Sequence, residues 1–188
     1  MSRVDRLLEN YVGLIGVPWR ADAAPMQRVM FCVYPKEEEL RLRRKVEEFR
    51  LKTVQAGHPM HVFDVSNTFA EWLAAQKYAR GYFERPEHID SLSSRYQTHI
   101  TESFQQFLRD HESGADAVVA LLGVGMLFGL LKVKAVVDTL APLVPGRLVI
   151  FFPGSYENQN YRLLDAYDGW NYLAVPITSE PDSGWSVA

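Results

Sequence analysis

The sequence predicts an α/β fold, with an open, mostly parallel sheet of about five strands and helices on both faces. Short apolar runs alternate along the chain with segments of helical periodicity, which is typical of strand–helix–strand units. The runs are apolar at nearly every position, not at every second one. That pattern indicates strands covered by helices on both faces of the sheet.

Length and composition favour a single globular domain. The chain has 188 residues, of which 47% are hydrophobic and 23% are charged, and these values exclude disordered and disulfide-rich classes. We assign residues 1–178 to this domain. The segment 179–188 (SEPDSGWSVA) is predicted to be a flexible C-terminal tail.

An opening helix is predicted at residues 2–15, with Ser2 as its N-cap. After a loop, the first strand is predicted at residues 29–34 (VMFCVY). The prediction of the opening helix is based on apolar residues that recur at spacings of three and four: Val4, Leu7, Leu8, Tyr11 and Ile15.

A second helix is predicted over residues 37–52, because acidic residues open the segment and basic residues follow, which complements the helix dipole. Gly57 is its predicted stop. The second strand is expected at residues 60–65. Thr68 and Glu71 then show the capping-box spacing that begins another helix.

The second half of the chain continues the alternation. A long amphipathic helix is predicted from about residue 86 to residue 111. A third strand at 117–122 is followed by a helix that starts at the glycines of 123–125 and stops near Pro142. The fourth and fifth strands are expected at 147–152 and 172–177.

Charge and cysteine content limit the partners and the compartment. The net charge of −3 and the mixed signs along residues 41–52 disfavour autonomous nucleic-acid binding. The apolar stretch 117–131 is too short to cross a membrane, so no membrane contact is expected. A single cysteine, Cys32, cannot form an internal disulfide, and we therefore expect a cytoplasmic protein.

No specific catalytic or metal-binding motif is present. Neither Ser66 nor Ser155 lies in the G-x-S-x-G pattern of serine hydrolases. We expect no catalytic residue, no metal and no cofactor. The histidines lack the helical spacing of zinc proteases: His58, His61, His88, His99 and His111.

A glycine-rich segment leaves two interpretations open. Gly123 and Gly125 lie between a strand and a helix, where backbone N–H groups can hold a phosphate. The segment lacks the lysine and hydroxyl of a P-loop, so tight packing of a buried helix is the favoured explanation. Asp64, at the end of the second strand, is likewise either a ribose contact or, more commonly, a turn residue.

The segment 153–171 is interpreted as a long loop after the fourth strand, at the carboxyl edge where open α/β sheets bind ligands. It is rich in Tyr, Arg and Trp, which are enriched at interaction hot spots. The alternative is a structural loop with its aromatic residues packed underneath. The candidate partner-binding residues are Tyr156, Glu157, Asn160, Arg162, Asp168 and Trp170.

Residues 151–177 (FFPGSYENQNYRLLDAYDGWNYLAVPI) resemble the C-terminal signature of the BrxB family, small proteins of bacterial BREX phage-exclusion systems. Similar segments at 18–29 (PWRADAAPMQRV), 69–87 (FAEWLAAQKYARGYFERPE) and 123–133 (GVGMLFGLLKV) extend the likeness over almost the whole chain. Two residues depart from it: Ser155 stands where an acidic residue is expected after the Pro–Gly pair, and Met126 stands where a small residue is commoner.

The resemblance implies a cytoplasmic accessory protein that acts with a methyltransferase, a large ATPase and the PglZ alkaline-phosphatase-like protein. We therefore expect a non-enzymatic assembly component that binds the PglZ-like protein and supports host DNA methylation and phage exclusion. The alternative is a degenerate nucleotide-binding regulatory domain, P-loop-like or Rossmann-like, which would use Gly123 and Gly125.

Overall fold

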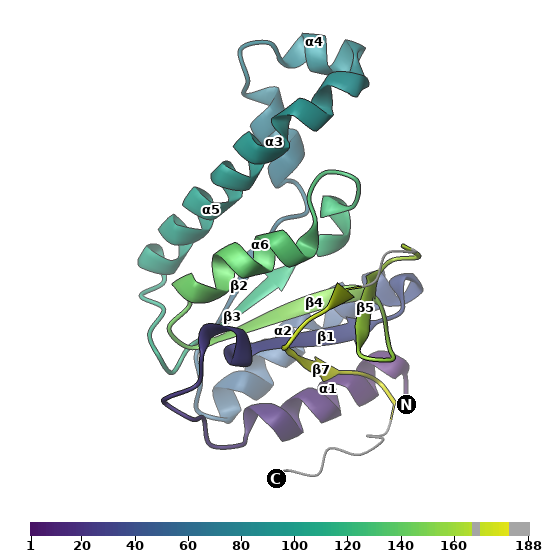
Figure 1. Ribbon diagram of the computed structural model, residues 1–188. Helices are drawn as coiled ribbons and strands as arrows, with labels where there is room; N and C mark the ends of the chain where they lie inside the picture. The colour runs from purple at the N-terminus through teal and green to yellow at the C-terminus, as the bar shows by residue number, and fades with distance from the viewer. Residues whose placement is uncertain (167–169, 181–188) are drawn as a thin grey trace.

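The computed structural model describes residues 1–166 and 170–180, so most of the tail predicted at 179–188 lies outside the described residues. Five parallel strands form the main sheet in the order β2-β3-β4-β1-β7 (Figure 1). The predicted parallel α/β fold is therefore confirmed. The strands are β1 (Val29–Tyr34), β2 (Met60–Asp64), β3 (Val118–Leu122), β4 (Arg147–Glu157) and β7 (Val175–Ile177).

The path of the chain sets the two edges of the sheet. After β1 the chain crosses to the far side and forms β2, then returns through β3 and β4 to lie beside β1, and β7 adds on the other side of β1. Because these strands are parallel, all of them end at one edge, here called the carboxyl edge. All of them begin at the opposite edge, called the amino edge.

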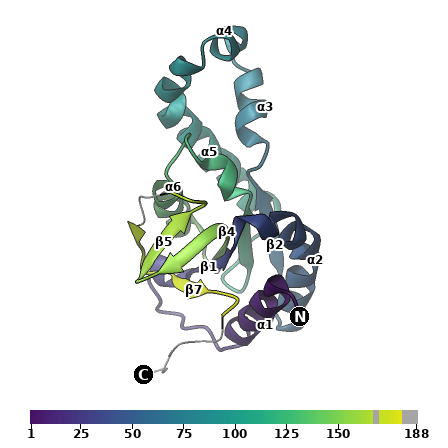
Figure 2. The ribbon, with the colours of Figure 1, turned by 90° about the vertical axis from the view of Figure 1, so that its right-hand side faces the viewer.

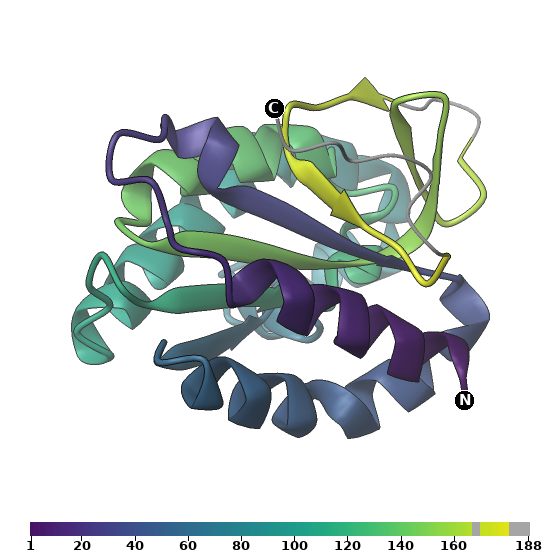
Figure 3. The same ribbon diagram turned by 90° about the horizontal axis from the view of Figure 1, so that it is seen from below.

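Helices cover both faces of the sheet, as predicted. On one face, α1 (Arg3–Ile15) and α2 (Glu39–Gln55) lie across the strands (Figure 3). On the other face lie α5 (Ser93–Asp110) and α6 (Val133–Leu140). Successive β1 residues alternate between the two cores: Phe31 packs toward α5 and α6, and Cys32 toward α1 and α2. Within the described residues, no helix combines the length and apolarity needed to cross a membrane.

The helix ends agree with the sequence in two places and differ in a third. Ser2 and Asp5 form a capping box at the start of α1, and Gly57, with φ +93°, follows the end of α2. The predicted capping box at Thr68 is wrong. Asn67 is the N-cap residue of α3 (Thr68–Ala74), while the Thr68 hydroxyl donates to the Val65 carbonyl.

An arm projects away from the sheet between β2 and β3 (Figures 1 and 2). It contains α3, α4 (Ala79–Glu84), the 3-10 helix η3 (Pro86–Leu92) and the first turns of α5. The α-helix predicted from residue 86 begins only at Ser93, because residues 86–92 form the 3-10 helix η3. The ring of Tyr96 on α5 packs against Phe69 and Trp72 of α3, with centroid separations of 4.9 and 5.4 Å, and these contacts join the two sides of the arm.

The helix predicted from the glycines of 123–125 to Pro142 is interrupted. The structure has a 3-10 helix, η4 (Val124–Leu127), then an irregular turn, α6, and a second 3-10 helix, η5 (Ala141–Leu143). Gly129 follows η4 with φ of +77°, a left-handed conformation that ends a helix, and Gly123, the N-cap residue of η4, has φ of +84°.

The segment 153–171 is not the predicted loop. Strand β4 continues to Glu157 and pairs antiparallel with β5 (Asn160–Leu163), which pairs with β6 (Trp170–Asn171). We call β4 from residue 153, its turn and β5 the carboxyl-edge hairpin (residues 153–163). Asn158 and Gln159 form its two-residue turn with φ of +51° and +64°, as in a type I′ turn. Further on, β7 begins at Val175, later than the strand predicted from residue 172.

Candidate functional site

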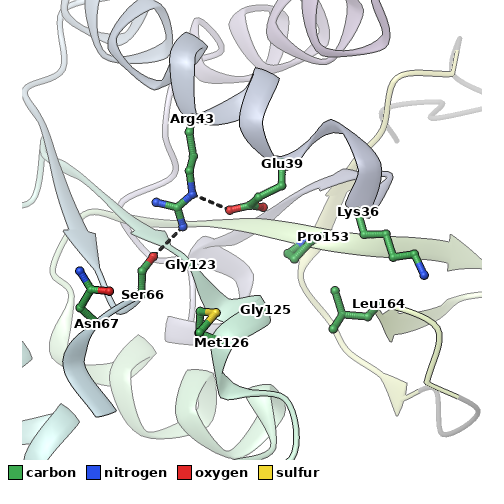
Figure 4. Close-up of a pocket in the computed structure, with 10 residues that line it drawn as sticks. All are labelled: Lys36, Glu39, Arg43, Ser66, Asn67, Gly123, Gly125, Met126, Pro153 and Leu164. Atoms are coloured by element: carbon green, nitrogen blue, oxygen red, sulfur yellow. Dashed lines mark hydrogen bonds and ion pairs between the residues drawn. The ribbon is translucent and has the colours of Figure 1, made fainter. Parts of the chain in front are cut away.

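A crevice of about 360 Å³ opens at the carboxyl edge, where β1 to β4 end and α2 begins (Figure 4). Open α/β sheets bind their ligands at this edge. One side of the crevice is charged or polar and the other is largely apolar. The lining residues are Lys36, Glu39, Arg43, Ser66, Asn67, Gly123, Gly125, Met126, Pro153 and Leu164.

Arg43 is the centre of the polar side. Its Nε donates to Glu39 at 2.7 Å and its Nη2 donates to the Ser66 hydroxyl at 2.6 Å (Figure 4). Its Nη1 donates to Asp64 at 3.1 Å. Partial burial lowers the pKa of Arg43, but the hydrogen bonds and charges of Glu39 and Asp64 outweigh it, so the net shift is upward. The guanidinium is therefore held charged by two carboxylates.

Asp64 stabilises the turn after β2. Its Oδ1 accepts the Ser66 backbone N–H at 2.9 Å and the Ser66 hydroxyl at 2.5 Å, while Oδ2 accepts from Arg43. This is the turn role that the sequence favours for Asp64. Both carboxylate oxygens already have partners within the protein.

The two glycines have packing reasons to be glycine. A Cβ on Gly123 would lie 2.3 Å from the Ser66 hydroxyl oxygen and 2.8 Å from an Asp64 carboxylate oxygen. A Cβ on Gly125 would lie 3.2 Å from the ring of Pro153. These contacts favour the packing interpretation, and nucleotide binding at Gly123 and Gly125 stays an untested alternative.

Both basic side chains that line the crevice are paired. Arg43 contacts two carboxylates, and Lys36 at the rim forms an ion pair with Asp165. On the apolar side, Met126 is 59% exposed. The arrangement is suited to an apolar or neutral group better than to an added anion, because an anion would compete with carboxylates already in place.

Two of the predicted partner-binding residues, Tyr156 on the hairpin and Trp170 on the adjoining β6, lie on the inner face of this small antiparallel sheet. The strand register places Tyr156, Tyr161 and Trp170 in one row across β4, β5 and β6. The Tyr156 and Tyr161 rings are 4.6 Å apart, and Trp170 packs edge-on against Phe152 at 5.6 Å. Tyr156 and Trp170 are partly buried, so they anchor the hairpin to the core that includes α6.

The outer face of the hairpin carries the other candidates. Arg162 pairs in register with Ser155, and Asn160 pairs with Glu157, so these side chains project away from the aromatic row. Glu157 and Arg162 are exposed, and Asn160 is half-buried. The structure thus gathers the described candidates in one small sheet, formed by the hairpin and β6, but divides them between its two faces. Asp168 lies outside the described residues.

The sequence did not predict Lys36, Glu39 and Arg43 as site residues. Glu39 belongs to the acidic start of the predicted helix and Arg43 to the mixed-charge segment 41–52, and neither pattern indicates a binding site. The available signal was position: a helix that follows a strand of a parallel sheet begins at the carboxyl edge, so its first turns line the site. The sequence-based expectation that the chain holds no metal rests on the spacing of its histidines. Within residues 1–166 and 170–180, no group of three or more His, Cys, Asp or Glu side chains is placed to hold a metal ion.

The model of one protein family, described as BREX protein BrxB, matches residues 63–177. The matched part runs from the end of β2 to the end of β7 and includes the arm, the glycines of the crevice and the carboxyl-edge hairpin. No curated protein and no solved structure matches the chain.

Proposed function

Because the chain belongs to the BrxB family, whose model matches more than half of it, we propose that it binds the PglZ alkaline-phosphatase-like protein of its own BREX system. Family membership makes the chain a component of a BREX phage-defence system. In our proposal it is a non-enzymatic accessory protein that supports host DNA methylation and phage exclusion. The BREX methyltransferase and ATPase are further possible partners.

The observation that carries the proposal is the construction of the carboxyl-edge hairpin. Its inner aromatic row is packed into the core, while Glu157 and Arg162 stand exposed on its outer face. Neither Glu157 nor Arg162 takes part in an ion pair among the described residues. A hairpin whose backbone is already fixed by strand pairing and aromatic packing loses little backbone freedom on binding, and its charged side chains have no ion-pair partner to give up, which favours a protein interface.

The non-enzymatic part of the proposal is supported by how the candidate reactive groups are used. Arg43, Asp64 and Ser66 are hydrogen-bonded to one another in the crevice. Cys32 lies fully buried in β1, and burial raises the pKa of its thiol, which disfavours a nucleophilic thiolate.

The test is binding of the purified PglZ-like protein, measured by calorimetry. Replacing a true interface anchor by alanine costs about 2 kcal/mol, roughly a thirtyfold loss of affinity. We expect such a loss for Arg162→Ala, a smaller one for Glu157→Ala, and unchanged melting temperatures for both because the side chains are exposed.

Arg109→Ala is the matched control, because Arg109 is another exposed arginine without an ion pair among the described residues, and it lies at the end of α5 that leads to the start of β3 at the amino edge. It should bind like the wild type. If both hairpin variants also fold and bind like the wild type, the interface lies elsewhere and the hairpin is structural.

The crevice gives the alternative, a nucleotide-binding regulatory domain, one supporting observation: its place at the carboxyl edge. A nucleotide that binds the folded state would raise the melting temperature. We expect neither ATP nor GTP to do so. A concentration-dependent rise that is lost in Gly125→Asp would favour the alternative.

A further inference from the structure

Two arginines lie side by side at the amino edge, opposite the hairpin and the crevice. Arg147 is the first residue of β4, and Arg28 immediately precedes β1. The parallel register pairs Val29 with Leu148, so it also brings Arg28 next to Arg147. Like charges placed directly across neighbouring strands repel each other.

Aromatic side chains and backbone carbonyls hold these arginines in place. The Arg147 guanidinium lies 4.8 Å from the ring centre of Trp19, and Trp19 stacks on His58 with a centroid separation of 3.7 Å and an interplanar angle of 7°. The His58 Nδ1 is 2.9 Å from the Asp116 carbonyl oxygen. Arg28 donates from Nη1 to the carbonyl of Pro145. We call Trp19, Arg28, His58 and Arg147 the amino-edge cluster.

The cluster has positive charge and hydrogen-bond donors without acceptors. Among residues 1–166 and 170–180, no carboxylate lies within 4.0 Å of a guanidinium nitrogen of Arg28 or Arg147. The Nε of Arg28 and the indole Nε1 of Trp19 are both buried and lack a hydrogen-bond partner. A buried donor without an acceptor is costly, so such groups in native proteins usually have a partner.

The pKa of Arg147 also reflects the lack of a nearby carboxylate. Partial burial lowers the pKa of Arg147, and the neighbouring charge of Arg28 lowers it further. By contrast, Arg43 at the opposite edge is surrounded by carboxylates, which raise its pKa. An anion placed beside the partly exposed guanidinium groups of Arg28 and Arg147 would relieve their repulsion and accept from their terminal N–H groups.

We propose that the amino-edge cluster binds a carboxylate of an acidic protein segment. Arginine forks and a carboxylate form paired, planar hydrogen bonds, and Arg and Trp are the residue types enriched at protein interaction hot spots. A nucleic-acid backbone is the weaker fit, because it needs a series of free cations and the chain carries a net charge of −3. This site is separate from the proposed PglZ-binding hairpin and leaves that hairpin free.

The test follows the side-chain indole N–H signals in an NMR titration with a terminally blocked pentaglutamate peptide at constant ionic strength. The Trp19 signal is identified by its loss in Trp19→Phe. We expect this signal to move saturably, because the Arg147 guanidinium that would bind the carboxylate lies 4.8 Å from the Trp19 ring centre. In Arg28→Gln and Arg147→Gln the peptide affinity should fall about tenfold or more, because each variant removes a charge-assisted fork.

The control variant is Arg41→Gln, which removes an exposed arginine outside the cluster and should leave the titration unchanged. Failure of pentaglutamate to move the Trp19 signal, or equal movement in the Arg28→Gln and Arg147→Gln variants, would overturn the proposal. Parallel titrations use inorganic phosphate and a short DNA duplex. If either moves the Trp19 signal at lower concentration than the peptide does, the ligand is a phosphate and the acidic-peptide assignment is wrong.

Discussion

At Gly123 the backbone conformation and the packing both require glycine. Its φ of +84° is left-handed, and a Cβ would overlap the Ser66 hydroxyl and the Asp64 carboxylate. Both groups belong to the Arg43 hydrogen-bond network, so a change here disturbs the turn after β2 and the polar wall of the crevice together.

We therefore predict that Gly123→Ala lowers the free energy of unfolding by about 2–4 kcal/mol, from strain and steric overlap. Urea denaturation measures this. Gly13→Ala is the control, because Gly13 lies inside α1 and has room for a Cβ. This variant should have a higher free energy of unfolding, since alanine has a better helix propensity than glycine. Equal stability of Gly123→Ala and the wild type would contradict the described turn.

His61 gives a pH dependence at the residue scale. Burial lowers the pKa of His61 from its ordinary value of 6.5, and the nearby His111, with rings 4.9 Å apart, adds to the effect. The unfolded chain therefore binds a proton more readily than the folded chain between the folded pKa and about 6.5. Stability from this group is full above about 6.5 and is lost as the pH falls toward the folded pKa.

The expected result is a melting temperature that declines as the pH is lowered below about 6.5. In His61→Asn the decline over this range should be smaller, whereas in His88→Asn, a change in the arm, it should match the wild type. Identical pH profiles for His61→Asn and the wild type would show that His61 does not carry the effect.

At the scale of elements, the buried strands could be predicted well and the hairpin could not. The strand predicted at 29–34 has the observed bounds of β1, because a six-residue run that is apolar throughout, rich in β-branched and aromatic residues and ended by Pro35, is typical of a strand covered on both faces. The hairpin contains Pro153, Gly154 and the turn residues Asn158 and Gln159, all of which are poor strand formers. Tertiary packing of the aromatic row overrides these local preferences.

Only part of the candidate site could be predicted, because some of its contacts join residues that are far apart in the sequence. The hairpin residues are close in sequence, so their clustering is visible there. Arg43, in contrast, bonds to Asp64 and Ser66, which are 21 and 23 residues away. No local pattern encodes such contacts. They follow only from the topology, which brings the start of α2 and the end of β2 to the same edge.

The turn of the hairpin offers a prediction at the element scale. Gln159 has φ of +64°, which strains a non-glycine residue, and Asn–Gly is a favoured pair for a type I′ turn. Gln159→Gly should raise the free energy of unfolding by about 0.5–1 kcal/mol. Chemical denaturation measures this.

The matched control is Arg44→Gly, because Arg44 is exposed in the middle of α2. Glycine should destabilise the helix there by about 1 kcal/mol. Destabilisation by Gln159→Gly would contradict the type I′ turn.

For the molecule as a whole, the parallel sheet separates two surfaces with different character. The carboxyl edge carries the crevice, whose charges are paired, and the hairpin, whose outer face is exposed. The amino edge carries the arginine pair, which has no carboxylate partner among the described residues. The arm projects from the sheet (Figure 2) and connects the end of β2, at the carboxyl edge, with the start of β3, at the amino edge. Such a distribution suits a protein that makes several contacts within an assembly.

The central claim is that the outer face of the carboxyl-edge hairpin contacts the PglZ-like protein. Hydrogen exchange of the backbone amides, measured with and without the purified partner, tests it most directly. The account predicts that the partner slows exchange in the hairpin, residues 153–163, while the amides of α4 in the arm exchange as in the free chain. Unchanged exchange in the hairpin together with slowed exchange elsewhere in the chain would contradict it.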